Sequence, residues 1–218
     1  MHGQVISYPK SGRSWLRFML AEARIEGVNF HHDGFEFNNG DLPPHNFSVE
    51  SRLAKYSVND KIILLRRDPR DVMVSLYHQV TGRFKDFFDF QGSISDFIRH
   101  NYFGAHVLSH YMDMWDEISA QRNYIQISYE AMHEDTAKEL LRVLKYLDLP
   151  AEEQAIQALV EAGNIENMKR IENAGTFSEP WLRPRNGFNK VRRGKVGNFK
   201  EELVQSDIQY LNEVFSLE

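Results

Sequence analysis

Short apolar runs alternate along the chain with longer segments whose apolar residues recur at helical spacing. Three of the runs predict β-strands, over residues 3–8, 61–67 and 123–130. A fourth candidate strand is the segment 27–32. The run at 61–67 reads KIILLRR and is apolar at consecutive positions, which is typical of a strand covered on both faces in a parallel sheet.

The segments between these runs predict helices. Residues 14–24 carry apolar side chains at positions three and four apart. The segment 68–80 starts with Asp68 as an N-cap and Pro69 as the first helical residue, which is a common helix start. Further helices are expected over 93–104, 106–118, 135–149 and 151–163. Strands that alternate with helices favour an α/β fold with a central, mostly parallel sheet flanked by helices.

Two segments fit neither pattern. Residues 81–92 are rich in Phe, Gly and charge, and residues 173–199 are basic and rich in Gly and Pro. Loops of this length within a compact domain are usually functional or disordered. We therefore expect residues 81–92 and 173–191 to be lids over a binding site.

Composition narrows the class of protein. The 218 residues, 42% of them hydrophobic, are enough for one domain spanning 1–218. The absence of Cys excludes disulfides, thiolate zinc sites and Cys nucleophiles. No apolar run approaches the roughly 18–20 residues that span a bilayer, so we expect a cytoplasmic protein with no membrane partner. A net charge of −5 disfavours a nucleic-acid partner, and any anion site must rest on local positive charge.

The run YPKSGRSW, at residues 8–15, has the chemistry of an anion cradle. It lies between a predicted strand and a predicted helix, where backbone N–H groups and the helix dipole face an anion. Lys10 and Arg13 add charge, Ser11 and Ser14 offer hydroxyls, and Gly12 permits close backbone approach. The order of residues is not that of a Walker A loop, and a solvated turn with two incidental cations is the alternative interpretation.

Two distant segments make the pattern specific. YPKSGRSW resembles the 5′-phosphosulfate loop of cytosolic-type sulfotransferases, LLRRDPRDVMVSLYH (64–78) resembles their second motif, and RRGKVGNFK (192–200) resembles their third. The three occur in the family's order over nearly the whole chain. The resemblance implies a P-loop-kinase-like sulfotransferase fold. It also implies transfer of a sulfuryl group from 3′-phosphoadenosine 5′-phosphosulfate (PAPS) to a small acceptor, with adenosine 3′,5′-bisphosphate (PAP) as product and no metal.

The resemblance also implies which residues hold the donor. Lys10 would stabilise the bridging oxygen as it leaves sulfur, and Trp15 and Tyr129 would flank the adenine. An adenine-side Thr and Phe of the family have no match in AGNIEN, at residues 162–167. The phosphosulfate would be bound by Lys10, Ser11, Gly12, Arg13 and Ser14. The 3′-phosphate would be bound by Arg67, Ser75, Arg192, Arg193 and Gly194.

The catalytic base is open between two histidines. The family's usual K-T-H sequence is absent, and either His32, just after an apolar run, or His45, in a Pro-rich loop, could serve. We favour His32 because its place resembles the end of a strand. A metal site at residues 31–33 is disfavoured because neighbouring side chains of a strand point to opposite faces. The histidines of HVLSH (106–110) lack an obvious third ligand.

The sequence leaves the oligomeric state, the acceptor and two alternative functions undecided. Arg13 replaces the family's common Thr, and residues 200–209 keep only the Lys of its dimerisation pattern, so the oligomeric state is undecided. A hydroxyl acceptor is preferred over an amine. The alternatives are a phosphoryl-transfer kinase on the same core, which would need Mg²⁺ and a Walker A loop, and a non-catalytic nucleotide-binding module that binds PAP without turnover.

Overall fold

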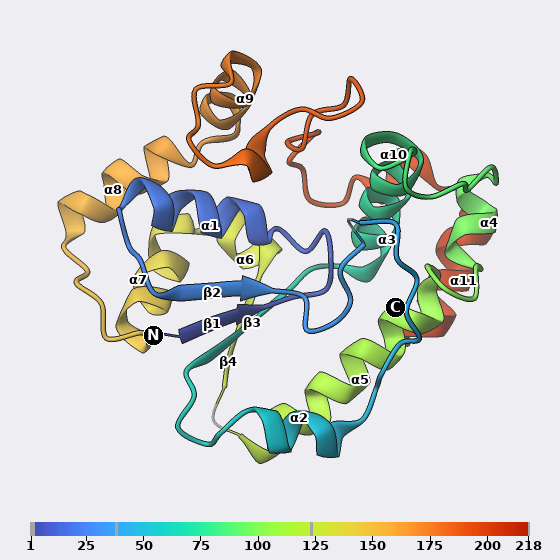
Figure 1. Cartoon of the computed structure of the whole chain (residues 1–218), viewed down its shortest axis with the longest axis horizontal. Coiled ribbons are helices and arrows are strands. Elements are labelled where there is room, and N and C mark those ends of the chain that lie inside the picture. Colours follow the sequence, from blue (N-terminus) through green and yellow to red (C-terminus); the bar gives the residue numbers. More distant parts are fainter. Residues whose placement is uncertain (1–2, 38, 123, 218) are drawn as a thin grey trace.

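Four parallel strands form the centre of the molecule (Figure 1). The computed structural model describes residues 3–37, 39–122 and 124–217. The strands lie in the order β2-β1-β3-β4, which confirms the expected α/β fold with a parallel sheet. In register, Val5 pairs with Ile63, and Ile63 pairs with Ile125. Their bounds are β1 (Gly3–Ile6), β2 (Val28–His31), β3 (Ile62–Arg66) and β4 (Ile125–Ser128).

Helices cover both faces of this sheet. Figure 1 shows α1, α7 and α8 on one side of the strands and α5 with α2 on the other. The long helices are α1 (Arg13–Glu22), α3 (Pro69–His78), α5 (Ala105–Gln121), α7 (Thr136–Tyr146), α8 (Glu153–Ala162), α9 (Ile165–Ala174) and α11 (Gln205–Phe215). The short ones are α2 (Val49–Lys55), α4 (Ile94–Ile98), α6 (Tyr129–Glu134) and α10 (Phe199–Glu202).

Strand β3 divides its side chains between two cores. Ile62 and Leu64 pack with residues of α3 and α5, whereas Ile63 and Leu65 pack with residues of α1, α7 and α8. Successive side chains of a strand point to opposite faces, so a continuous apolar run is what a sheet covered on both sides requires. The burial pattern predicted for 61–67 is therefore found in β3.

Local capping sets the helix starts. The Asp68 carboxylate accepts a hydrogen bond from the Arg70 N–H at 2.9 Å, with Pro69 as the first residue of α3, as the sequence predicts. The strand expected to reach residue 130 ends at Ser128 instead, because the Ser128 hydroxyl caps α6 by accepting from Ala131 N–H. Residue 123, the expected start of that strand, lies outside the described residues.

The helix predicted over 93–104 is shorter in the structure. It is α4, whose start is a capping box between Ser93 and Asp96. After Ile98 the chain turns back, and the His100 ring Nδ1 accepts from the N–H groups of Tyr102 and Phe103. These side-chain hydrogen bonds take the place of helical ones, so α5 starts afresh at Ala105.

The two segments expected as lids contact each other. The first begins in a π-helical turn η1 (Gln79–Arg83), and the second contains the 3-10 turn η2 (Pro180–Leu182). Arg185 pairs with Asp86 at 2.5 Å and lies 3.8 Å from the Phe87 ring centroid. The Arg83 guanidinium donates to the carbonyl of Phe188. These contacts join the two segments to each other, and their expected role as lids stays a prediction.

Within the described residues, every helix is too short or too polar to cross a membrane.

Candidate active site

A cavity of about 370 Å³ opens at the carboxyl ends of β1 and β3. The chain leaves β1 toward β2 on one side and leaves β3 toward β4 on the other, so this is a topological switch point, where open α/β sheets bind ligands. Residues 9–10 and 12–15 line the cavity from the loop after β1 and the start of α1, and residues 190–195 line it from the C-terminal segment. Segments from opposite ends of the sequence thus share one site.

Most residues predicted for the donor site line this cavity. They are Lys10, Gly12, Arg13, Ser14, Trp15, His32, Arg67, Ser75, Tyr129, Arg192, Arg193 and Gly194. Ser11 is buried behind the loop and lines a smaller cavity with Tyr8 and Tyr111. His45 lies outside the lining of this cavity.

The loop between β1 and α1 has a backbone that fits a close ligand approach. Lys10 and Gly12 have φ angles of 73° and 97°, in the left-handed region. A Cβ atom at Gly12 would lie 2.4 Å from Cδ2 of Tyr129, so the start of α6 leaves no room for a side chain there. Gly12 is also the N-cap of α1, and its successors Arg13 and Ser14 bring the positive end of that helix to the cavity.

Positive charge dominates the cavity wall. Of the described residues that line it, seven are Lys or Arg and none is Asp or Glu. Burial, together with the nearby Arg83, Arg67 and Arg192, lowers the pKa of Lys10 to about 7. Burial and the charge of Lys10 also lower the pKa of Lys190 well below its usual value. Crowded cations of this kind are stabilised by an anionic ligand.

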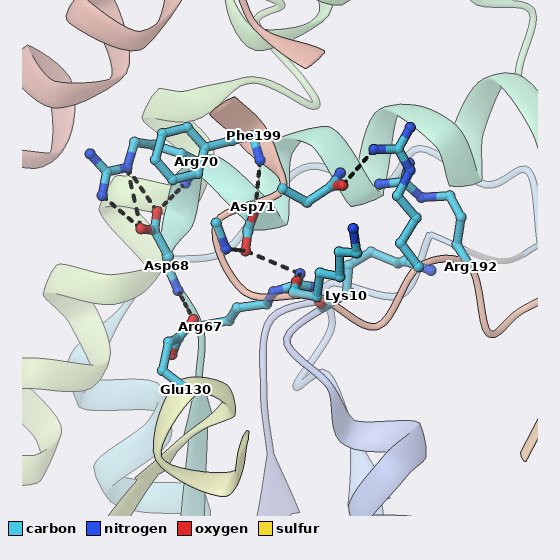
Figure 2. A network of polar contacts seen from close by, with 12 residues as sticks. Lys10, Arg67, Asp68, Arg70, Asp71, Glu130, Arg192 and Phe199 are labelled. Atoms are coloured by element: carbon cyan, nitrogen blue, oxygen red, sulfur yellow. Dashed lines mark hydrogen bonds and ion pairs between the residues drawn. The ribbon is translucent and has the colours of Figure 1, made fainter. Parts of the chain in front are cut away.

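Arg67 lies at the centre of a network that joins three parts of the chain (Figure 2). Its guanidinium donates to the carbonyls of Lys10, at 3.3 Å, and Lys195, at 3.1 Å. It also pairs with Asp71 at 3.2 Å and lies 4.2 Å from the Tyr129 ring centroid. Its Nε is buried and has no hydrogen-bond partner among the described residues.

Asp71 fastens the C-terminal segment to the start of α3. Its carboxylate accepts from the N–H groups of Gly197 and Phe199, both at 2.9 Å (Figure 2). Nearby, the Asp68 N–H donates to the Glu130 carboxylate at 2.9 Å. Arg192 pairs with Glu202 at 2.5 Å. The basic residues of the third motif are thereby held beside those of the second.

Aromatic rings form the wall at the other end of the cavity. Trp15 lies 5.7 Å from Tyr129 and 4.7 Å from His133, measured between ring centroids. Its indole N–H donates to the Gly163 carbonyl at 2.8 Å. Such a wall suits a planar nucleobase, because aromatic side chains can stack on the faces of a flat ring.

The two candidate bases have different surroundings. His32 lines the cavity, and its Nδ1 lies 2.7 Å from the Ser7 carbonyl, so it donates from Nδ1 and keeps a lone pair on Nε2. Burial, Arg13 and Lys190 lower the pKa of His32 well below its usual value, although the Ser7 hydrogen bond raises it. His45 instead donates to the Tyr102 carbonyl and stacks on Phe35, away from the cavity lining.

Several lining residues were not predicted. Lys190 lies two residues before the start of the third motif, so its charge in a basic segment was a usable signal. Asn164, Ile165 and Met168 come from AGNIEN and the start of α9, the stretch where the family's adenine-side residues have no match. His133 and Thr136, on α6 and α7, carried no sequence signal that points to a nucleotide. The remaining unpredicted lining residues are Pro9, Gln79, Val160, Gly163, Val191, Lys195 and Asn198.

The fold and the cation-lined cavity define an α/β protein that binds a nucleotide-sized anion. The family profile described as "Sulfotransferase domain" matches residues 4–217, so the chain belongs to the sulfotransferase family. The amine sulfotransferase of Oryctolagus cuniculus is 26% identical, over 98% of this chain and 79% of its own length. Human sulfotransferase 2B1 is 28% identical, over 69% of this chain but only 42% of its own length.

Solved structures have the same fold. The mouse sulfotransferase SULT7A1, complexed with PAP, matches with a TM-score of 0.68 and 17% identity, over 98% of this chain and 82% of its own. Retinol dehydratase, in complex with androsterone and PAP, matches with a TM-score of 0.63 and 18% identity, over 98% and 79%. The chain is therefore a PAPS-dependent sulfotransferase, and neither the kinase nor the non-catalytic interpretation finds support.

Proposed function

We propose that the chain transfers the sulfuryl group of PAPS to a hydroxyl of a small acceptor, with His32 as the base and Lys10 as the residue that stabilises the leaving group. The observation that carries the proposal is that both side chains line one cavity, with Nε2 of His32 free to accept a proton. The relatives include an amine sulfotransferase and 3-hydroxysteroid sulfotransferases, so the kind of acceptor has to be argued from the site.

The cavity fits the donor. Nε of Arg67 is buried without a hydrogen-bond partner among the described residues, which leaves a donor for an anion. Lys10 and the start of α1 would hold the phosphosulfate, and Arg67, Ser75 and Arg192–Gly194 the 3′-phosphate. Trp15 and Tyr129 would flank the adenine. When bound, PAPS supplies an activated sulfuryl group whose leaving group is a phosphate.

His32 and Lys10 act on two different oxygen atoms, His32 on that of the acceptor and Lys10 on that of the 5′-phosphate. His32 accepts the acceptor's proton at Nε2 while the acceptor oxygen forms its bond to sulfur. Lys10 stabilises the electron pair that remains on the 5′-phosphate oxygen as the bond from sulfur to that oxygen breaks. The proton thus ends on His32 and the charge on PAP, so the step balances without a further reactant.

Charge favours a hydroxyl over an amine. An aliphatic amine is protonated at neutral pH, and the lining carries no carboxylate among the described residues to receive an ammonium group. A hydroxyl enters uncharged and meets a neutral His32, because the pKa of His32 is lowered.

Transfer from ³⁵S-labelled PAPS to phenol and to benzylamine tests the proposal. Wild-type protein should label phenol, and His32→Ala should lower kcat by about 10²–10⁴-fold, the usual contribution of a general base. His45→Ala is the matched control and should keep at least half of the wild-type kcat. Lys10→Met should lower kcat by about 10²–10³-fold. Full activity of His32→Ala, or preferential labelling of benzylamine, would contradict the proposal.

The expectation that the reaction needs no metal stays a prediction. Activity that is unchanged by excess EDTA would support it.

A further inference from the structure

The Lys and Arg side chains that line the cavity differ in whether a carboxylate is paired with them. Arg67 pairs with Asp71, Arg192 with Glu202, and Arg193 with Glu201 at 2.5 Å. These are the residues that the donor's 3′-phosphate would meet. Their carboxylate partners lie outside the lining and hold them in place.

Arg13 and Lys190 lack such partners among the described residues. Nη1 of Arg13 is buried with no hydrogen bond to a described residue, and Glu36, whose charge raises the pKa of Arg13, accepts a hydrogen bond from the His32 backbone N–H at 2.9 Å. The Lys190 ammonium lies 5.2 Å from the Trp181 ring centroid, and no carboxylate of the described residues pairs with it. Buried charge without a partner is unfavourable unless a ligand completes it.

Both cations are close enough to His32 to act on it electrostatically. Each lowers the pKa of His32, and all three side chains line the same cavity. The acceptor's reacting oxygen has to meet Nε2 of His32, so the rest of the acceptor lies beside Arg13 and Lys190. Lys190 is fixed there because its backbone N–H and that of Val191 both donate to the buried Glu172.

We propose that the acceptor carries an oxyanion, a carboxylate or a phosphate-type group, and that Arg13 and Lys190 bind it beside His32. This inference rests on the proposed function, since it assigns the acceptor of that same site. A guanidinium fork and an ammonium suit an oxyanion, and one-signed charge in a low-dielectric cavity attracts it while repelling ammonium groups. The Arg13 that replaces the family's common Thr is then a specificity-determining residue.

Binding without turnover gives the first test. Phenylacetate, its neutral isostere phenylacetamide and the cation phenethylamine are each titrated into protein saturated with PAP, which has no sulfuryl group to transfer. Phenylacetate should bind about 30-fold or more tighter than phenylacetamide, the ratio expected for a buried charge pair. Phenethylamine should bind more weakly than phenylacetamide. Equal affinities, or no binding of phenylacetate, overturn the proposal.

Variants assign the preference to residues. Arg13→Thr and Lys190→Met should each reduce the ratio of phenylacetate to phenylacetamide affinity about tenfold, and Arg13→Lys should retain most of it. A loss that falls equally on both ligands would place these residues in the donor site and overturn the proposal. Benzylphosphonate in the same titration distinguishes the two anions: tighter binding than phenylacetate indicates a phosphate-type group, and weaker binding indicates a carboxylate.

Turnover separates this inference from the proposed function. In transfer assays, 4-hydroxyphenylacetate should have a kcat/KM about 30-fold or more above that of 4-hydroxyphenylacetamide. Equal values for the two phenols would overturn the anionic acceptor while supporting hydroxyl transfer. If neither phenol is sulfated but phenylacetate still binds preferentially, the transfer chemistry fails and the anion site stands.

Discussion

In the proposed mechanism, two ionisable side chains in the cavity, Lys10 and His32, limit activity at opposite ends of the pH range. This mechanism needs Lys10 charged and His32 neutral. Because the pKa of Lys10 is lowered to about 7, its charge in the free protein is lost as pH rises through 7. Because the pKa of His32 is lowered well below 6.5, its neutral form persists until the solution is distinctly acidic. With ordinary pKa values the acid limit would lie at about pH 6.5 and the alkaline limit only at about pH 10.4, so the lowered pKa values move both limits to lower pH.

The first prediction is therefore a kcat/KM profile that declines above about pH 7 and on the acid side falls only well below pH 6.5. The alkaline limb of kcat should lie at higher pH, because bound PAPS brings negative charge that favours the Lys10 ammonium. Lys10→Arg, whose guanidinium stays charged, is the control and should lack the limb near pH 7. The assignment fails if kcat/KM of the wild type stays constant to pH 9.

At the scale of elements, the contact between the loop after β1 and α6 sets the shape of the proposed phosphosulfate site. Gly12→Ala would place a Cβ 2.4 Å from the Tyr129 ring in a backbone with φ of 97°. We expect a loss of about 1–3 kcal/mol in the free energy of unfolding, together with weaker PAP binding. Urea unfolding and calorimetry measure the two effects.

The variant Gly34→Ala distinguishes the effect of backbone strain from that of a steric clash. Gly34 has a φ of 90° but open space around its Cβ position, so the substitution should lower stability without weakening PAP binding. Equal losses of PAP affinity in both variants would argue against the Tyr129 contact.

A second prediction at this scale concerns the joint between α3 and the C-terminal segment. Asp71→Asn replaces an acceptor of two backbone N–H groups and one guanidinium by a side chain that must turn an NH₂ group toward one of them. We expect a loss of about 1.5–3 kcal/mol in unfolding free energy and weaker PAP binding. Asp116→Asn, at a surface pair with Arg66, should change stability by less than about 1 kcal/mol. Similar losses of unfolding free energy in both variants would show that Asp71 does not hold α3 to the C-terminal segment.

The elements that the sequence predicts well are those with local causes. The core strand at 61–67 and the Asp68–Pro69 helix start depend on neighbours along the chain, and both are found. The end of α4 and the start of α6 depend on side-chain hydrogen bonds to backbone groups of turns, which periodicity does not report. Helices α9 and α11 were missed: α9 lies mostly between the helix predicted over 151–163 and the basic segment 173–199, and α11 lies beyond that segment, where no element was predicted.

The residues of the site also fall into two groups, those that the sequence could predict and those that it could not. Lys10, Arg67 and Arg192 belong to motifs of fixed spacing, so they could be named in advance. His133 and Thr136 reach the cavity only through the packing of separate elements. The choice between His32 and His45 needed the position of the loop that carries His45, whose ring stacks among Phe35 and Tyr102.

At the scale of the whole molecule, the donor site joins segments from both ends of the sequence, so the donor's product should stabilise the fold. At 100 times its Kd, PAP should add about 2.7 kcal/mol and raise Tm by roughly 5–11 °C. AMP at the same concentration should raise Tm by about 1 °C, because it lacks the 3′-phosphate that Arg67, Ser75 and Arg192 would bind. Differential scanning fluorimetry measures both shifts.

Arg192→Met should bring the PAP shift down toward that of AMP. Equal shifts by PAP and AMP in the wild type would remove these residues from the 3′-phosphate role.

The joint at Asp71 also has a consequence for the timing of biosynthesis. Its partners Gly197 and Phe199 follow it by more than 120 residues, whereas the loop at 8–15 is made among the first. At about 5–20 residues per second, residue 199 is added on the order of 10 to 40 seconds after that loop. During this interval the nascent chain can build β1, β2 and β3 but has no segment to close over Arg67. Donor binding therefore begins late in translation, and it would report that the ribosome has passed residue 199.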